Sequence, residues 1–162
     1  MKNDKWSPVE ERIAEFFGKT TYKDFREGFG GTRESLTARD FAQAMEAVEH
    51  EHGSLVPFVL ETKYGSTLTH ERELCRGWEK FFDKVDPKAG KETKQFSRFA
   101  CTLAIRELAG ASHSRAAMLQ YAWIMCVRRE ALEAAVWLIG SWLDELAGAG
   151  VEAFKKQFKK AA

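Results

Sequence analysis

The sequence predicts an all-α protein: a single-domain helical bundle of about six to eight helices with an aromatic-rich core. Two observations predict this class. Apolar residues recur at intervals of three and four along most of the chain, which is the period of a helix that buries one face. No segment alternates apolar and polar residues over the length of a strand. The 162 residues suit one domain, over 1–162, with a subdivision near 86–91 as the alternative.

Composition limits the classes of protein that fit. Hydrophobic residues make up 44% of the chain, which is enough for a packed core. Basic and acidic residues, 25 and 24, leave a net charge of +1, so the chain lacks the overall basicity of a purely electrostatic nucleic-acid binder. The odd number of cysteines without C-x-x-C spacing predicts neither a disulfide framework nor a zinc site. Because the N-terminal residues also lack a secretory signal, we expect a cytoplasmic protein with no membrane span.

Capping signals and apolar stripes predict the helices of the first half. Ser7-Pro8-Val9-Glu10 combines an N-cap serine, a proline at the first helical position and a capping-box glutamate. This helix should end near Gly18. Further helices are expected over 37–52, 55–64 and 70–85, the last with Leu74, Trp78, Phe81 and Val85 on its buried stripe.

The second half is more apolar. Helices are expected over 92–109, 115–127 and 130–147, followed by a basic helix over 151–160. Residues 115–127 are apolar around nearly the whole circumference, so this helix should lie at the centre of the bundle. We expect a break at Arg128-Arg129, and we expect Gly148-Ala149-Gly150 to end the helix before the last one.

Aromatic side chains are expected to fill the core. Trp78, Trp123, Trp137 and Trp142 lie within the predicted helices. Trp6, which precedes the first N-cap, is an exception, and Phe29 lies in the glycine-rich loop 28–32. We expect Trp6 and Phe29 to be exposed anchors for a protein partner.

A metal site is a weak alternative. Glu49-His50-Glu51-His52 resembles a ligand cluster, with His70 as a further contributor. Adjacent helical positions point about 100° apart, so only part of this set can converge. The doubled Glu-x-x-His pattern of carboxylate-bridged metal bundles is absent. His50 and His52 are therefore weak candidates, and we expect no metal or other cofactor.

No catalytic residue is predicted. Ser112-His113-Ser114 resembles a helix cap rather than part of a triad. The cysteines, Cys75, Cys101 and Cys126, fall in apolar helical patterns and lack the polar, partly exposed setting of an activated thiolate.

The C-terminal segment carries the strongest functional signal. Val151, Phe154 and Phe158 share one helix face, while lysines cover the rest. The favoured interpretation is a docked terminal helix with a solvated basic face. The alternative is a contact with nucleic-acid phosphates, made by Arg128, Arg129, Lys155, Lys156, Lys159 and Lys160.

Three functions follow from these patterns. The first is a non-enzymatic helical interaction protein that acts through a protein partner, as a small subunit of a larger assembly. The second is a subunit of a nucleoprotein complex that binds RNA or single-stranded DNA without reading sequence. The third is a metal-dependent helical-bundle enzyme around His50 and His52.

Overall fold

The computed structural model describes residues 6–18 and 38–161. These residues form seven helices and no strand, with 81% of them helical, which confirms the predicted all-α bundle. Phe29 and the loop 28–32 lie outside the described residues. The helices are α1 (Pro8–Phe16), α3 (Ala38–His52), α4 (Leu55–Gly65), α5 (Glu71–Val85), α6 (Lys91–Leu108), α7 (Arg115–Ile124) and α8 (Arg129–Ala161).

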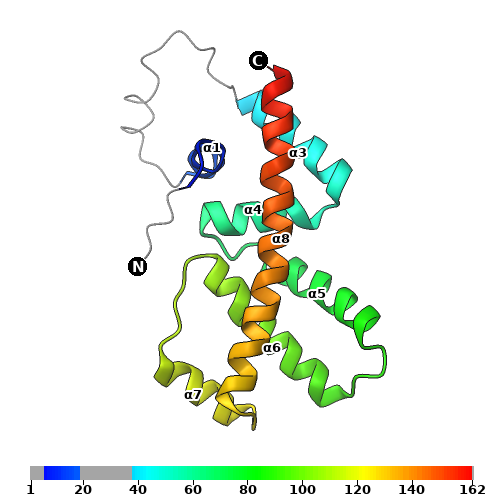
Figure 1. Cartoon of the computed structure of the whole chain (residues 1–162), viewed down its shortest axis with the longest axis vertical. Helices are drawn as coiled ribbons and strands as arrows, with labels where there is room; N and C mark the ends of the chain where they lie inside the picture. The colour runs from blue at the N-terminus through cyan, green and yellow to red at the C-terminus, as the bar shows by residue number, and fades with distance from the viewer. Residues whose placement is uncertain (1–5, 19–37, 162) are drawn as a thin grey trace.

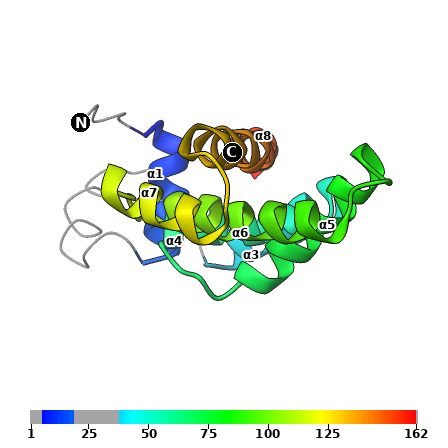
Figure 2. The ribbon, with the colours of Figure 1, turned by 90° about the horizontal axis from the view of Figure 1, so that it is seen from below.

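The longest helix, α8, is the spine of the molecule (Figure 1). Its 33 residues extend for about 50 Å at 1.5 Å per residue. It packs against α1, α3, α4, α6 and α7, and its Trp142 reaches Trp78 of α5. Seen along its axis, α8 lies on one side of a layer that contains α4 to α7 (Figure 2). Every other helix is therefore held, at least in part, by contact with this one.

The buried face of α8 follows the helical period without interruption. Leu132, Val136, Ile139 and Leu143 are at most 4% exposed, and Val151 and Phe154 continue the face near the C-terminus. These side chains are spaced by three and four residues, so they line one side of the helix. One face of α8 is thus buried from its second turn to its last turns.

Two hydrophobic clusters lie along this face. The first joins α5, α6 and α7 to the beginning of α8, and the second joins α1 and α3 to its end. α4 contributes Val59 to the first cluster and Tyr64 to the second, and Leu146 of α8 packs against both. The two clusters are therefore connected through α4 and α8.

The glycines at 148 and 150 do not end the helix, so that prediction was wrong. A Cβ atom on Gly150 would lie 2.8 Å from both the Leu60 Cδ1 and the Val56 Cγ1 of α4. Glycine at this position lets α8 approach α4 closely, and the apolar burial around it outweighs the low helix propensity of glycine, about 1 kcal/mol. A Cβ atom on Gly148, in contrast, would meet nothing within 4 Å.

The α5–α6 hairpin is held by a regular series of contacts. Asp83 pairs with Lys94 at 3.3 Å, Glu79 with Arg98 at 2.5 Å and Glu71 with Arg106 at 3.9 Å. Each acid lies on α5 and each base on α6, and the acid nearest the end of α5 pairs with the base nearest the start of α6. This order is that of a single antiparallel register. Beneath it, the buried Trp78 donates a hydrogen bond from Nε1 to Ser97 Oγ at 2.7 Å.

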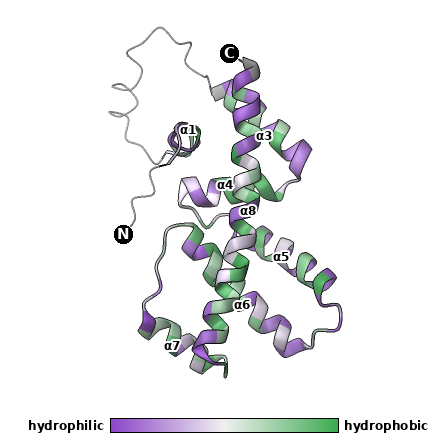
Figure 3. Ribbon diagram, in the orientation of Figure 1, coloured by the Kyte–Doolittle hydropathy of each residue, from purple (hydrophilic) through white to green (hydrophobic). Residues whose placement is uncertain are grey.

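Hydrophobic and hydrophilic residues mix along these two helices (Figure 3), as expected of helices that bury one face. The predicted stripe of α5 is only half correct, however. Leu74 and Trp78 are buried, whereas Phe81 is 42% and Val85 66% exposed. The apolar stripe of α5 continues towards the end of the helix, where neighbouring helices no longer cover it fully.

The position predicted for α7 was also wrong. Only Met118 and Ala122 of this helix are buried, and it lies at the edge of the bundle rather than at its centre. Apolar residues around α7 allow several of its faces to be buried. The sequence does not show how many of those faces are covered by other helices. The predicted break before α8 is confirmed: Cys126 has a φ of 55°, and Val127 N–H donates to Ala122 O at 3.0 Å.

The first helix begins as predicted. Ser7 N–H donates to Glu10 Oε2 at 2.8 Å, while Ser7 Oγ accepts from Glu10 N–H, which completes the capping box. Tyr64 of α4 donates its hydroxyl to Glu10 Oε1 at 2.7 Å. Burial raises the pKa of Glu10, but these hydrogen bonds outweigh it and leave the pKa below its ordinary value. The same carboxylate thus caps α1 and fastens it to α4.

A pair of glycine substitutions tests the close approach of α8 to α4. Gly148→Ala should raise the free energy of unfolding by about 0.5–1 kcal/mol, because alanine favours a helix and its methyl group meets no neighbour. Gly150→Ala should lower it by about 1–2 kcal/mol, because Leu60 and Val56 must move. Urea denaturation followed by circular dichroism measures both. Equal shifts for the two variants would contradict the packing described.

Candidate interaction surface

Large apolar side chains are exposed mainly at one end of the molecule. Of the nine such side chains most exposed among the described residues, five lie on α7 and the first third of α8. We call these five the α7–α8 surface: Leu119, Trp123, Ile124, Trp137 and Leu138. Trp123 and Trp137 are 81% and 72% exposed. The other four, Phe16, Leu68, Phe81 and Val85, are distributed over α1, α5 and the loop before α5.

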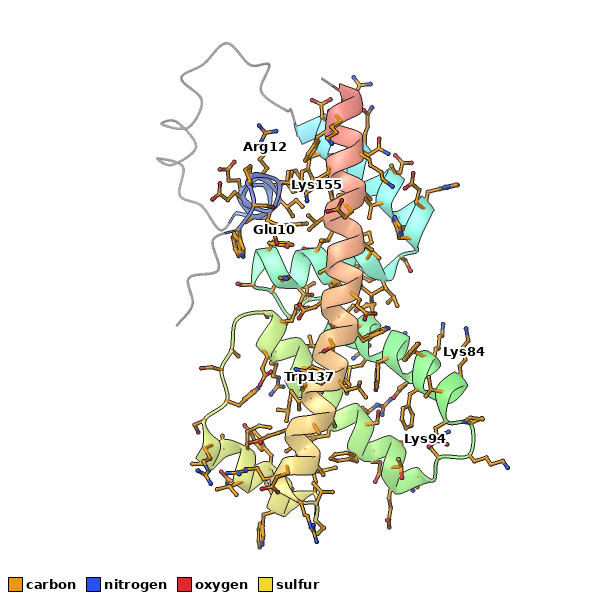
Figure 4. The ribbon with its side chains drawn as sticks, viewed as in Figure 1. Glu10, Arg12, Lys84, Lys94, Trp137 and Lys155 are labelled. Carbon is orange, nitrogen blue, oxygen red and sulfur yellow. The ribbon has the colours of Figure 1, made fainter. Side chains whose placement is uncertain are left out.

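Helical geometry explains why these residues are outside. Trp137 follows the buried Val136, and Trp123 follows the buried Ala122. One step along a helix turns a side chain by about 100°, away from the face that its neighbour buries. Figure 4 shows Trp137 on the half of α8 that is distant from Lys155. The expectation that Trp123 and Trp137 fill the core was therefore wrong.

The predicted partner anchor Trp6 is not part of this surface. Its ring packs edge-on against Tyr64, with centroids 5.4 Å apart, and it borders the second hydrophobic cluster. Trp6 precedes α1, in the other half of the molecule from α7 (Figure 1). Phe29 lies outside the described residues. No sequence signal separates Trp123 and Trp137 from core residues, because buried residues such as Ile105 also follow a buried neighbour.

The predicted basic residues fall into two groups at opposite ends of α8. Arg129 and Lys155 are separated by 26 positions, or about 39 Å along the helix. Arg129 contacts Glu130 at 3.3 Å and Glu133 at 3.5 Å, and Arg128 beside it is exposed. The structure therefore does not join the arginines to the C-terminal lysines.

The C-terminal lysines lie together on the outside of a docked helix. Lys155 contacts Glu152 at 2.8 Å, and Lys156 and Lys159 are exposed. The Lys160 side chain lies outside the described part. Phe154 is fully buried and packs against Phe158, which agrees with the favoured interpretation of a docked terminal helix.

The histidines lie in separate environments. His50 and His52 are exposed at the end of α3, and His52 lies 3.8 Å from Glu51. His70 pairs with Glu61 and stacks on Phe58 at 4.3 Å. Within 6–18 and 38–161, no three His, Cys, Asp or Glu side chains are placed to hold a metal ion.

A groove of about 460 Å³ lies between the α3–α4 turn and α5. Its lining mixes Leu55 and Phe58 with charged side chains of both signs, including Glu73 and Arg76. The buried Glu73 Oε2 has no hydrogen-bond partner among the described atoms. The residues that line this groove include no serine–histidine or cysteine–histidine pair in hydrogen-bonding contact.

One cysteine has a setting that the sequence did not predict. Cys75 of α5 is partly exposed and lies 3.9 Å from Thr102 Oγ1, at the position in the α5–α6 series between two ion pairs. A hydrogen bond from Cys101 lowers the pKa of Cys75 to about 7, although burial and nearby glutamates act in the opposite direction. The same hydrogen bond, together with burial, raises the pKa of Cys101. Cys75 is thus partly exposed beside a hydroxyl group, while it also packs against the first hydrophobic cluster.

Tryptophan substitutions test whether the exposed tryptophans of the α7–α8 surface contribute to the stability of the fold. Trp123→Ala and Trp137→Ala should each change the free energy of unfolding by less than about 0.5 kcal/mol, because exposed side chains lose little burial. Trp78→Ala is the matched control and should cost about 3–5 kcal/mol. Urea denaturation gives all three values. A loss above about 2 kcal/mol for either exposed tryptophan would mean that it packs in the fold.

None of the described helices has the length and hydropathy that crossing a lipid bilayer requires. No protein-family model, curated protein or solved structure matches the chain.

Proposed function

We propose that this protein is a non-enzymatic interaction module that binds a protein partner through the α7–α8 surface, as a small subunit of a larger assembly. The observation that carries the proposal is the exposure of Trp123 and Trp137, at 81% and 72%. Tryptophan is among the residues most enriched at the energetic centres of protein interfaces. Exposed apolar groups of this size on a folded protein are typical of interaction sites.

The scaffold behind the surface supports this role. Met118 and Ala122 fix α7 against the core, and Leu132 and Val136 fix the start of α8. The exposed side chains are therefore presented by helices whose opposite faces are already packed. Such preorganisation reduces the entropy that binding must overcome.

The free energy that burial of these side chains could supply also supports a protein partner. Burying a large apolar side chain contributes roughly 2–3 kcal/mol, so the five side chains could together supply at most about 10–15 kcal/mol. Association costs about 4–15 kcal/mol in lost rigid-body freedom, so these contacts must be supplemented by others. Exposed charges of both signs lie on α7, on the first turns of α8 or between the two helices: Arg115, Arg128, Glu130 and Glu133. An apolar centre with a charged rim is the usual composition of such an interface.

The nucleic-acid alternative has less support. Its basic residues divide into two groups, and Arg129 and Lys155 are paired with glutamates. Lys156 and Lys159 are the exposed lysines of the C-terminal group whose side chains are described. Two or three phosphate contacts would give weak binding with a shallow salt dependence.

Site-specific photocrosslinking in the source cells tests the proposal. A photoreactive residue placed at position 123 or at position 137 should give the same discrete protein adduct. The adduct from position 123 should be lost when Trp137→Asp is added, because a carboxylate would be buried at the interface.

Position 85 provides the matched control, since Val85 is also apolar and 66% exposed but lies at the end of α5. Adducts at 123 and 137 that are no stronger than at 85, or that differ between the two positions, would refute the proposed binding surface. A nucleic-acid adduct in place of a protein adduct would favour the alternative function.

A further inference from the structure

Basic residues occupy every fourth position along most of α5. All of them are exposed, and we call them the α5 basic stripe: Arg72, Arg76, Lys80 and Lys84. Each step along the stripe advances about 6 Å and turns about 40° around the helix, so the four cations lie on one side of α5 over about 18 Å. Lys84 points away from α6 (Figure 4).

The acids of α5 do not neutralise this stripe. Glu71, Glu79 and Asp83 pair instead with bases of α6. Among the residues that the structure describes, no acid forms an ion pair with a cation of the α5 basic stripe. Like charges four residues apart destabilise a helix, so the stability of α5 does not explain the stripe. The surface is locally basic although the whole chain carries a net charge of only +1.

The groove between the α3–α4 turn and α5 lies beside the stripe. Arg76 and Lys80 of the stripe line it, together with the aromatic ring of Phe58. Its volume of about 460 Å³ is in the range of ligand-binding clefts, about 300–1,000 Å³. Glu73 also lines the groove, and its carboxylate repels phosphate but can accept a hydrogen bond from the amino group of a base. The groove therefore suits an uncharged part of a polyanion, whereas the stripe suits its charges.

Single-stranded nucleic acid has both parts. Its phosphates repeat along one backbone, and its unpaired bases can turn outward to stack on aromatic side chains. Proteins that bind single strands without reading sequence combine a track of cations with such an aromatic side chain. Evenly spaced cations also match a regular polymer better than they match an acidic protein segment, whose carboxylates have no fixed interval.

We propose that the α5 basic stripe binds the phosphates of single-stranded nucleic acid, and that the groove beside it accepts a base against Phe58. This surface is distant in the sequence from Trp123 and Trp137, so the inference does not depend on the proposed function.

The salt dependence of binding measures how many phosphates the protein contacts. The experiment follows the fluorescence anisotropy of a labelled DNA strand of about 12 nucleotides with the full-length protein, between about 20 and 200 mM NaCl. Four contacts should make the logarithm of the dissociation constant rise with that of the salt concentration at a slope of about 3, or about 0.7 per phosphate. Arg76→Gln combined with Lys80→Gln should lower this slope by about 1.4.

Lys156→Gln combined with Lys159→Gln is the matched control, because it removes two exposed cations from α8 instead of α5. It should leave the slope unchanged, and circular dichroism checks that both double variants fold. A strand of the same length that lacks its bases should bind the natural chain at least about five-fold more weakly, which is the effect of one stacked base.

Three results would overturn the proposal. The first is no binding at about 20 mM NaCl, and the second is an equal loss of slope in the α5 and α8 double variants. The third is equal affinity for the strand without bases, since the groove would then hold no base. Displacement of the strand by polyglutamate at an equal concentration of charges would likewise contradict it, in favour of an acidic protein partner.

Discussion

The fold depends on burying one continuous face of α8. That face contacts two hydrophobic clusters that otherwise share only α4, and Leu146 lies where they meet. Apolar burial at about 25 cal/mol per Å² is the term that holds a helix of this length against the other helices. Gly150 shows how specific the requirement is, because even a methyl group there would collide with α4. Helix propensity alone would have divided α8 at this point.

Much of the fold could be predicted from the sequence. The capping box at Ser7, the helix class and most helix bounds follow from short-range patterns that depend on a few neighbouring residues. The predictions that were wrong concern contacts between residues far apart in the sequence. The apolar circumference of α7 does not reveal that only Met118 and Ala122 find neighbours, and the glycines of α8 do not reveal that Leu60 lies against one of them.

The candidate sites were less predictable for the same reason. The exposure of Trp123 and Trp137 depends on which faces the other helices cover, and the contact of Cys75 with Thr102 depends on the register of the α5–α6 hairpin. That register could have been anticipated, since the paired acids on α5 and the paired bases on α6 recur at intervals of four and eight residues. The same helix, α8, therefore serves both the core and the α7–α8 surface, because it buries one face and leaves Trp137 on another.

Amide hydrogen exchange along α8 tests this account most directly. If one buried face couples both clusters, amides from Ile139 to Phe154 should exchange with a common free energy equal to that of global unfolding. The glycines at 148 and 150 should then show no step in protection. A separate, weaker protection for residues after Gly150 would show that the C-terminal part of α8 opens by itself, and the spine would not be a single cooperative unit.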